Sequence, residues 1–163
     1  MIVVSNTSPI INLACIGQLD LLRQIYGQIT IPDAVFTEIT MNGIGQPGAE
    51  DVPRLPWIVR HRVIQQPLIQ VLRLELDTGE AEALAGALEL NADLVLLDER
   101  RAREAAQRLG LRFIGLLGVL IEAQRQQRLS QIRPLLDDLR QKAGFWITDA
   151  LYQRVLAAAG ESP

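Results

Sequence analysis

The chain has 163 residues, one cysteine and a formal net charge of −3, and 48% of its residues are hydrophobic. This length suits a single domain, residues 1–163, in which the helices from about residue 130 extend the same domain. One cysteine excludes an intramolecular disulfide framework, no apolar run approaches the ~20 residues of a membrane span, and the start lacks the basic segment of a signal peptide. We therefore expect a cytoplasmic protein without a membrane segment.

The charges are distributed unevenly along the chain. Residues 1–98 carry 5 arginines and 12 acidic residues, whereas residues 99–163 carry 10 arginines and Lys142 against 7 acidic residues. Ordinary solvated helix faces would explain this asymmetry. An acidic site facing a basic half that holds a polyanion or an acidic partner would explain it equally well.

Short apolar runs and turn residues divide the first half of the chain into alternating strands and helices. The sequence SNTSP at residues 5–9 is typical of a helix start, with capping residues followed by proline in the first turn. Residues 42–56 are rich in Gly and Pro and predict a long loop, with a helical turn near 49–52. Periodicity predicts strands at 2–4, 28–31 and 57–64, and helices at 10–16, at 19–26 and from Pro32.

The second half continues the same alternation. Strands are expected at 94–97 and 112–114, and helices at 68–76, from Asp77, from Glu99, and at 116–127, 130–142 and 148–159. Strands separated by helices throughout predict an α/β fold in which a mostly parallel sheet has helices on both faces. The apolar run at 94–97 reads as a strand buried on both faces, and the alternating run at 57–64 as an edge strand.

Three acidic residues are candidates for a functional site at the carboxyl ends of these strands. Glu80 has capping-box spacing from Asp77, yet it shares a helix face with apolar residues, whereas Glu82 lies on the polar side and is expected in solvent. Asp98 follows the buried strand directly and could equally cap the next helix. Glu38 borders the apolar stripe of its own helix, where a purely structural role is also ordinary.

Carboxylates gathered at one end of a parallel sheet would form an all-oxygen cluster. Such a cluster suits Mg²⁺ or Mn²⁺ rather than zinc, and these ions support phosphodiester cleavage. Glu99 and Arg103 are spaced for an i, i+4 ion pair. Nearby hydroxyl and arginine side chains would contact phosphate groups, namely Ser8, Arg100, Arg101 and Arg103.

Several ordered motifs make the chain resemble the PIN domains, and more closely a bacterial PIN-like family related to the VapC toxins. The motifs are VVSNTSPIINLA, IPDAVFTEI, GEAEALA, LVLLDERRAR and the tail from IGLLGVLIEAQ to FWIT, which together cover nearly the whole chain. The resemblance implies a three-layer α/β/α fold with a central parallel sheet. It also implies an Mg²⁺- or Mn²⁺-dependent ribonuclease, the toxin partner of a small antitoxin, and we expect a homodimer.

The resemblance assigns Glu38, Glu80 and Asp98 to the catalytic acids and metal ligands, with Glu99 as a weaker additional acid. Asn6 stands where PIN domains usually carry Asp as a principal metal ligand. An Asn side chain offers a carbonyl oxygen but no charge, so metal affinity should fall. A PIN fold with weakened catalysis that binds protein or RNA is therefore the main alternative, while Ser5-Asn6 argues against a phospho-acceptor receiver domain.

Three further residues or segments carry weaker signals. We expect Cys15 to be a buried structural thiol and His61 a surface residue of the edge strand, since no second His or Cys suggests a zinc site. The segment at 145–147 (FWI) is expected to pack in the core, although an interface with another subunit or the antitoxin is also open.

Overall fold

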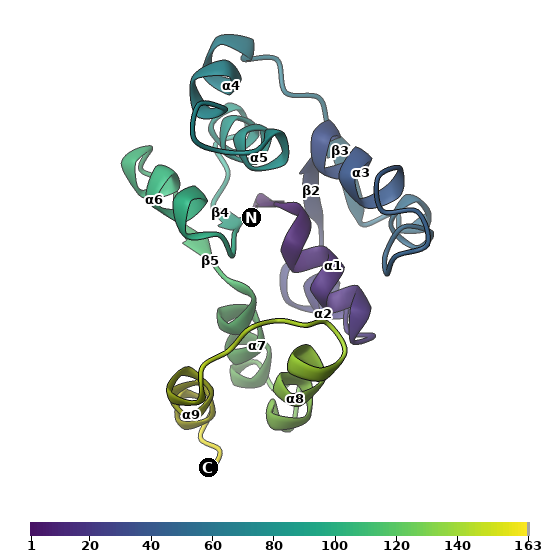
Figure 1. Cartoon of the computed structure of the whole chain (residues 1–163), viewed down its shortest axis with the longest axis vertical. Coiled ribbons are helices and arrows are strands. Elements are labelled where there is room, and N and C mark those ends of the chain that lie inside the picture. Colours follow the sequence, from purple (N-terminus) through teal and green to yellow (C-terminus); the bar gives the residue numbers. More distant parts are fainter. Residues whose placement is uncertain (163) are drawn as a thin grey trace.

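The computed structural model describes residues 1–162 and contains a five-stranded, all-parallel sheet with the order β3-β2-β1-β4-β5 (Figure 1). The strands are β1 (Val3–Ser5), β2 (Ile29–Pro32), β3 (Ile58–His61), β4 (Leu94–Leu96) and β5 (Phe113–Ile114). Parallel pairing aligns Ser5 with Leu96 and Leu96 with Ile114, so the strands end together at one edge of the sheet. The predicted α/β class and parallel sheet are confirmed.

Helices connect the strands and cover both faces of the sheet. They are α1 (Thr7–Cys15), α2 (Asp20–Tyr26), α3 (Asp33–Thr40), α4 (Gln66–Leu72), α5 (Thr78–Glu89), α6 (Arg100–Arg108), α7 (Leu116–Arg125), α8 (Arg133–Gln141) and α9 (Asp149–Ala158), with a 3₁₀ turn η1 (Val52–Arg54). Within residues 1–162, none of these helices is long and apolar enough to cross a membrane.

Side chains of alternating direction on the strands divide the core into two apolar clusters. Val3 and Leu96 pack with α1, α2, α3, α7, α8 and α9, whereas Val4 and Val95 pack with α4, α5 and α6. Successive strand residues point to opposite faces, which explains why these central strands are apolar throughout. The last helices share the first cluster, and they lie with α7 at the end of the molecule opposite α4 and α5 (Figure 1).

Two helices begin at residues other than those predicted from hydrophobic periodicity, and proline explains both starts. The helix expected at 68–76 begins at Gln66, and the helix expected at 130–142 begins at Arg133, each with proline in its first turn. Proline costs nothing there because the first N–H groups of a helix have no intrahelical acceptor. The 3₁₀ turn in the 42–56 loop is Val52–Arg54, slightly later than expected.

Three of the weaker expectations need correction. Cys15 is half-buried, and its Sγ donates to the Lys142 carbonyl at 3.3 Å. His61 lies on the edge strand β3 but is half-buried, with Nε2 3.0 Å from Glu89 Oε2. Within the 145–147 segment only Ile147 is buried, while Trp146 is 83% exposed. The sequence could not predict how far these side chains are buried, because the residues that contact them come from distant segments of the chain.

Leu96 is fully buried on the interior strand β4, so truncating its side chain should strongly destabilise the fold. We expect Leu96→Ala to lower the free energy of unfolding by about 2–5 kcal/mol, because it removes buried methyl groups and leaves a cavity. Leu74→Ala is the matched control, since Leu74 is exposed and should change stability by less than about 0.5 kcal/mol. Urea unfolding measures both, and equal effects would contradict the proposed core.

Candidate active site

A polar hollow opens at the carboxyl edge of the sheet, where β1, β2 and β4 end. Its volume is about 480 Å³. The lining side chains come from the start of α1, from α3, from the start of α5 and from the segment after β4: Asn6, Thr7, Ser8, Ile11, Asn12, Glu38, Asp77, Glu80 and Glu99. Ligands of open parallel sheets bind at this edge, so the hollow is the candidate active site.

Asn6 is the residue that links the hollow to the centre of the sheet. It caps α1 with extended backbone geometry, and its N–H donates to the Leu96 carbonyl at 3.1 Å, which fixes it beside β4. The side chain is buried, and within the described residues Oδ1 has no hydrogen-bond partner. An unsatisfied buried acceptor costs about 1–3 kcal/mol, so this oxygen is suited to a donor or a cation supplied by a ligand.

Glu38 reaches the hollow from α3. The Thr7 hydroxyl donates a short hydrogen bond to its Oε2. Gly79 lies against the carboxylate so closely that a Cβ there would be 2.5 Å from Oε1. Burial raises the pKa of Glu38, and the charges of Asp77 and Glu82 add to this, while the Thr7 and Gly79 hydrogen bonds oppose it.

Glu80 is held at the start of α5 by a capping box. Its N–H donates to Asp77 Oδ1 at 2.7 Å, and the Asp77 N–H donates to Glu80 Oε1 at 3.3 Å. Glu80 is buried, as its helical phase predicts. Burial raises its pKa to about 7, with hydrogen bonding and charge repulsion from Asp77 and repulsion from Glu99 as further causes.

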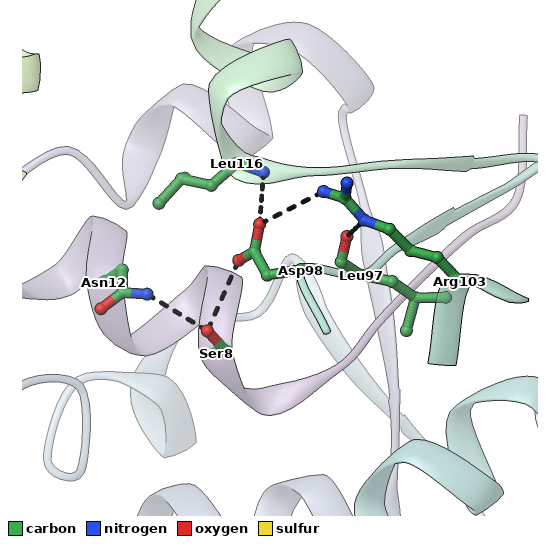
Figure 2. A network of polar contacts seen from close by, with 6 residues as sticks. All are labelled: Ser8, Asn12, Leu97, Asp98, Arg103 and Leu116. Atoms are coloured by element: carbon green, nitrogen blue, oxygen red, sulfur yellow. Dashed lines mark hydrogen bonds and ion pairs between the residues drawn. The ribbon is translucent and has the colours of Figure 1, made fainter. Parts of the chain in front are cut away.

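Asp98 is separated from this hollow and faces a different set of partners (Figure 2). Its Oδ1 accepts the Leu116 N–H at 2.8 Å and lies 3.8 Å from Arg103 Nη2, while its Oδ2 is 3.4 Å from Ser8 Oγ. Burial raises the pKa of Asp98, and the Leu116 and Arg103 contacts oppose that rise. Asp98 therefore caps the distant helix α7 and not the helix that follows it.

The segment after Asp98 also differs from the expectation. Glu99 is the N-cap of α6 and is exposed toward the hollow, without a side-chain capping bond. The expected Glu99–Arg103 ion pair is wrong, because Arg103 Nε donates to the Leu97 carbonyl at 2.9 Å and its guanidinium lies near Asp98. Arg100 pairs with Glu104 at 3.0 Å, and Arg101 is exposed on the same helix.

The predicted site residues thus fall into three groups. Asn6, Ser8, Glu38, Glu80 and Glu99 line the hollow together. Asp98 and Arg103 line a second hollow, and Asp98 is linked to the first through the Ser8 hydroxyl and through its neighbour in the chain, Glu99. Arg100 and Arg101 stand on the exposed start of α6.

Sequence reasoning missed three participants around the hollow. Asp77 and Thr7 line it, and each directly adjoins a predicted element start, which is the signal that could have identified them. Glu82 was expected in solvent, but its Oε1 accepts the Ala34 N–H at 3.1 Å at the start of α3. Helical periodicity predicted which side of α5 carries Glu82. It could not predict that α3 would pack against that side.

The donor set of the hollow suits a hard divalent cation. All of its candidate ligands are oxygens, and among the described residues Asn6 Oδ1 lacks a partner. Burial raises the pKa values of Glu38 and Glu80, so their charged forms would be stabilised by a cation. Within residues 1–162, however, no three His, Cys, Asp or Glu side chains already converge as a metal-binding group. The oxygen ligands therefore fit a divalent metal by their chemical type. The Glu38 and Glu80 carboxylates, however, are held by hydrogen bonds within the protein and do not yet point to one common centre.

A comparison with protein families concerns the chain as a whole. A family model described as a PIN domain matches residues 2–161, nearly the whole chain. No curated protein matches the chain.

The raised pKa of Glu80 predicts that the metal-free protein loses stability between about pH 5 and about pH 8. The native carboxyl keeps its proton up to a pKa of about 7, whereas the unfolded one releases it near 4.5, so the native state binds more protons in this interval. Glu80→Gln keeps an acceptor for Asp77 N–H but carries no charge. We expect it to flatten this part of the profile and to unfold at higher urea than wild type at about pH 8.

Urea unfolding in EDTA across this pH range, followed by circular dichroism, measures the effect. Glu50→Gln is the matched control, because Glu50 is exposed and lies outside the hollow. Equal slopes for wild type and Glu80→Gln would show that Glu80 does not titrate in this way.

Proposed function

Because the chain belongs to the PIN-domain family, whose fold is nuclease-like, we propose that it is a metal-dependent ribonuclease. The observation that carries the proposal is the unpaired, buried Asn6 Oδ1 beside Glu38 and Glu80 in one hollow at the carboxyl edge of the sheet. The reaction is hydrolysis of RNA phosphodiester bonds, with Mg²⁺ or Mn²⁺ as the cofactor.

The proposed ligands are Asn6, Glu38, Glu80 and Glu99, with Asp98 contributing through Oδ2, the oxygen that faces Ser8. When bound, the metal would activate water and stabilise the negative charge that develops on the phosphate. Thr7 orients Glu38, and the Asp77 backbone orients Glu80, so the protein limits the rotation of both acids. Ser8 in the hollow and Arg100 and Arg101 at the exposed start of α6 are the proposed donors for phosphate oxygens.

The biological setting is proposed from the resemblance to the VapC toxins. On that basis the protein is the cytoplasmic toxin of a toxin–antitoxin pair, inhibited by a small cognate antitoxin, and acts as a homodimer. The basic excess of residues 99–163 is compatible with an RNA substrate, because it supplies cations for phosphate contacts.

A second candidate function is a PIN fold that binds RNA or protein with weakened catalysis. Asn6 favours it, since an amide supplies no negative charge to a metal that usually binds several carboxylates. The absence of three converged acidic groups among the described residues favours it as well.

The two candidates differ in one cleavage experiment. We expect the purified protein to cleave single-stranded RNA with Mn²⁺, and Glu80→Gln to lower the rate at least about 100-fold. Asn6→Asp should raise the apparent metal affinity, because it adds the missing charge. Glu50→Gln should cleave at the wild-type rate, since Glu50 is exposed outside the hollow.

Each other outcome has a defined meaning. Cleavage that appears only in Asn6→Asp would support the weakened binding module. Wild-type activity no greater than that of both Glu80→Gln and Asp98→Asn would exclude the ribonuclease function for this chain.

Gly79 provides a test that does not alter any acidic residue. A Cβ at this position would overlap the Glu38 carboxylate, so Gly79→Ala must displace the carboxylate from its present position in the hollow. We expect a loss of Mn²⁺-dependent cleavage of about 10- to 100-fold with little loss of stability, because only the flexible end of a side chain moves. Gly86→Ala in the same helix is the control, since its Cβ would meet a Val63 methyl group at 3.1 Å and no carboxylate. Equal activity of the two variants would contradict the placement of Glu38.

A further inference from the structure

The second hollow is lined by Asp98 and Arg103, and the function proposed for the first hollow does not explain it. Its volume is about 360 Å³, and its lining includes Asp98, Arg103, Gly115, Gly118, Trp146 and Leu151. This volume falls at the lower end of the ~300–1,000 Å³ found for small-ligand sites. Asp98 lines the second hollow and is linked to the first through Ser8, because its Oδ2 faces Ser8 Oγ while its Oδ1 accepts the Leu116 N–H (Figure 2).

Trp146 presents a large aromatic surface to solvent at the mouth of this second hollow. It is 83% exposed, in a chain whose aromatic content is only 4%. The backbone that carries it is anchored, since Ile147 is buried and its carbonyl accepts a hydrogen bond from Arg140 Nη2 at 2.9 Å. An exposed indole on an anchored backbone is suited to stacking, because every nucleobase has a face that can pack on it.

Arg103 supplies a positioned cation in the same hollow. Its Nε donates to the Leu97 carbonyl at 2.9 Å, which holds one edge of the guanidinium. Asp98 Oδ1 lies 3.8 Å from Nη2, which makes an ion pair but is too long for a hydrogen bond, so the N–H groups of Nη2 are not used by this carboxylate. The terminal nitrogens therefore keep donors for an anion, and a planar guanidinium binds phosphate oxygens in pairs.

Because Gly115 has no side chain, the Arg103 guanidinium can lie directly against its backbone. A Cβ at Gly115 would overlap Arg103 Nη2, so no other residue is compatible with this position of the guanidinium. The start of α7, which Asp98 caps, is thus shaped around the arginine. The aromatic surface, the positioned cation and the glycine against it occur together in one hollow, which is linked to the candidate active site through Asp98 and Ser8.

We propose that the second hollow is a nucleotide-binding subsite for single-stranded RNA, in which a base stacks on Trp146 and a neighbouring phosphate binds Arg103. This inference rests on the proposed function, because it identifies how the same substrate extends past Asp98. In addition to the ligand role proposed for its Oδ2, Asp98 then positions the second hollow, since its Oδ1 holds the start of α7 and faces Arg103. RNA is favoured over a protein segment because the hollow joins a positioned arginine to an exposed aromatic surface and adjoins the proposed site of phosphodiester cleavage.

The test measures binding without cleavage. A fluorescently labelled single-stranded hexanucleotide of RNA is titrated in EDTA, and its anisotropy gives the dissociation constant. We expect Trp146→Ala and Trp146→Leu to weaken binding by roughly 5- to 150-fold, the range that corresponds to the stacking of one base. Trp146→Phe keeps an aromatic face and should bind within about threefold of wild type. Leu74→Ala removes an equally exposed apolar side chain elsewhere and should bind as wild type does.

The arginine is tested by salt dependence. We expect Arg103→Ala to reduce the slope of log affinity against log salt by about 0.7, the value for one phosphate contact on a single strand. Arg112→Ala is the matched control, because Arg112 is exposed at the opposite, amino end of β5. Thermal unfolding checks that each variant remains folded, and Trp146→Ala tests the proposal even if Arg103→Ala does not fold.

The outcomes separate this inference from the proposed ribonuclease. Trp146-dependent binding by a protein that does not cleave RNA would support the subsite and reject the nuclease. Wild-type affinity of Trp146→Ala, or no RNA binding by the wild type, would overturn the subsite whatever the cleavage assay shows. Wild-type affinity of Trp146→Leu would overturn stacking, and loss of self-association by Trp146→Ala with unchanged RNA affinity would assign the hollow to a protein interface.

Discussion

The parallel pairing of β1 with β4 is the constraint on which the candidate site depends. Ser5 lies opposite Leu96, and the Asn6 N–H continues the pairing to the Leu96 carbonyl. Residues more than 90 positions apart in the chain therefore reach the same sheet edge. Because all five strands run in one direction, their following segments also meet at that edge, and α3 and α5 add Glu38 and Glu80.

Gathering polar groups at this edge has an energetic consequence. Each carboxylate is partly removed from water, and each is stabilised by a local donor: Thr7 for Glu38, the Asp77 backbone for Glu80 and the Leu116 backbone for Asp98. These bonds do not fully compensate for burial, since the pKa values of all three acids are raised. Asn6 Oδ1 remains without a donor, and a bound cation would relieve both deficits.

Asp98 shows where residue-level prediction reached its limit. The sequence locates it after a buried strand, and the structure agrees, but its partners belong to α1, α6 and α7. The expected local cap and the expected Glu99–Arg103 pair both assumed that neighbours in sequence would be neighbours in contact. Glu82 departed from the prediction of a solvated side chain for the same reason. The start of α3 lies against α5, and its Ala34 N–H donates to the Glu82 carboxylate. Glu80 was correctly placed, since burial along one helix follows from helical phase alone.

The sequence by itself determined the alternation of strands and helices, the parallel class of the sheet, the edge position of β3 and the inward direction of Glu80. These features follow from local periodicity, from turn and proline chemistry, and from the apolar character of strands covered on both faces. Only the tertiary structure decided which acids share a hollow, which arginine is held beside Asp98, and that Trp146 stands exposed at a second hollow. Those outcomes depend on side chains from distant segments competing for the same hydrogen bonds and the same space, and no local pattern encodes that competition.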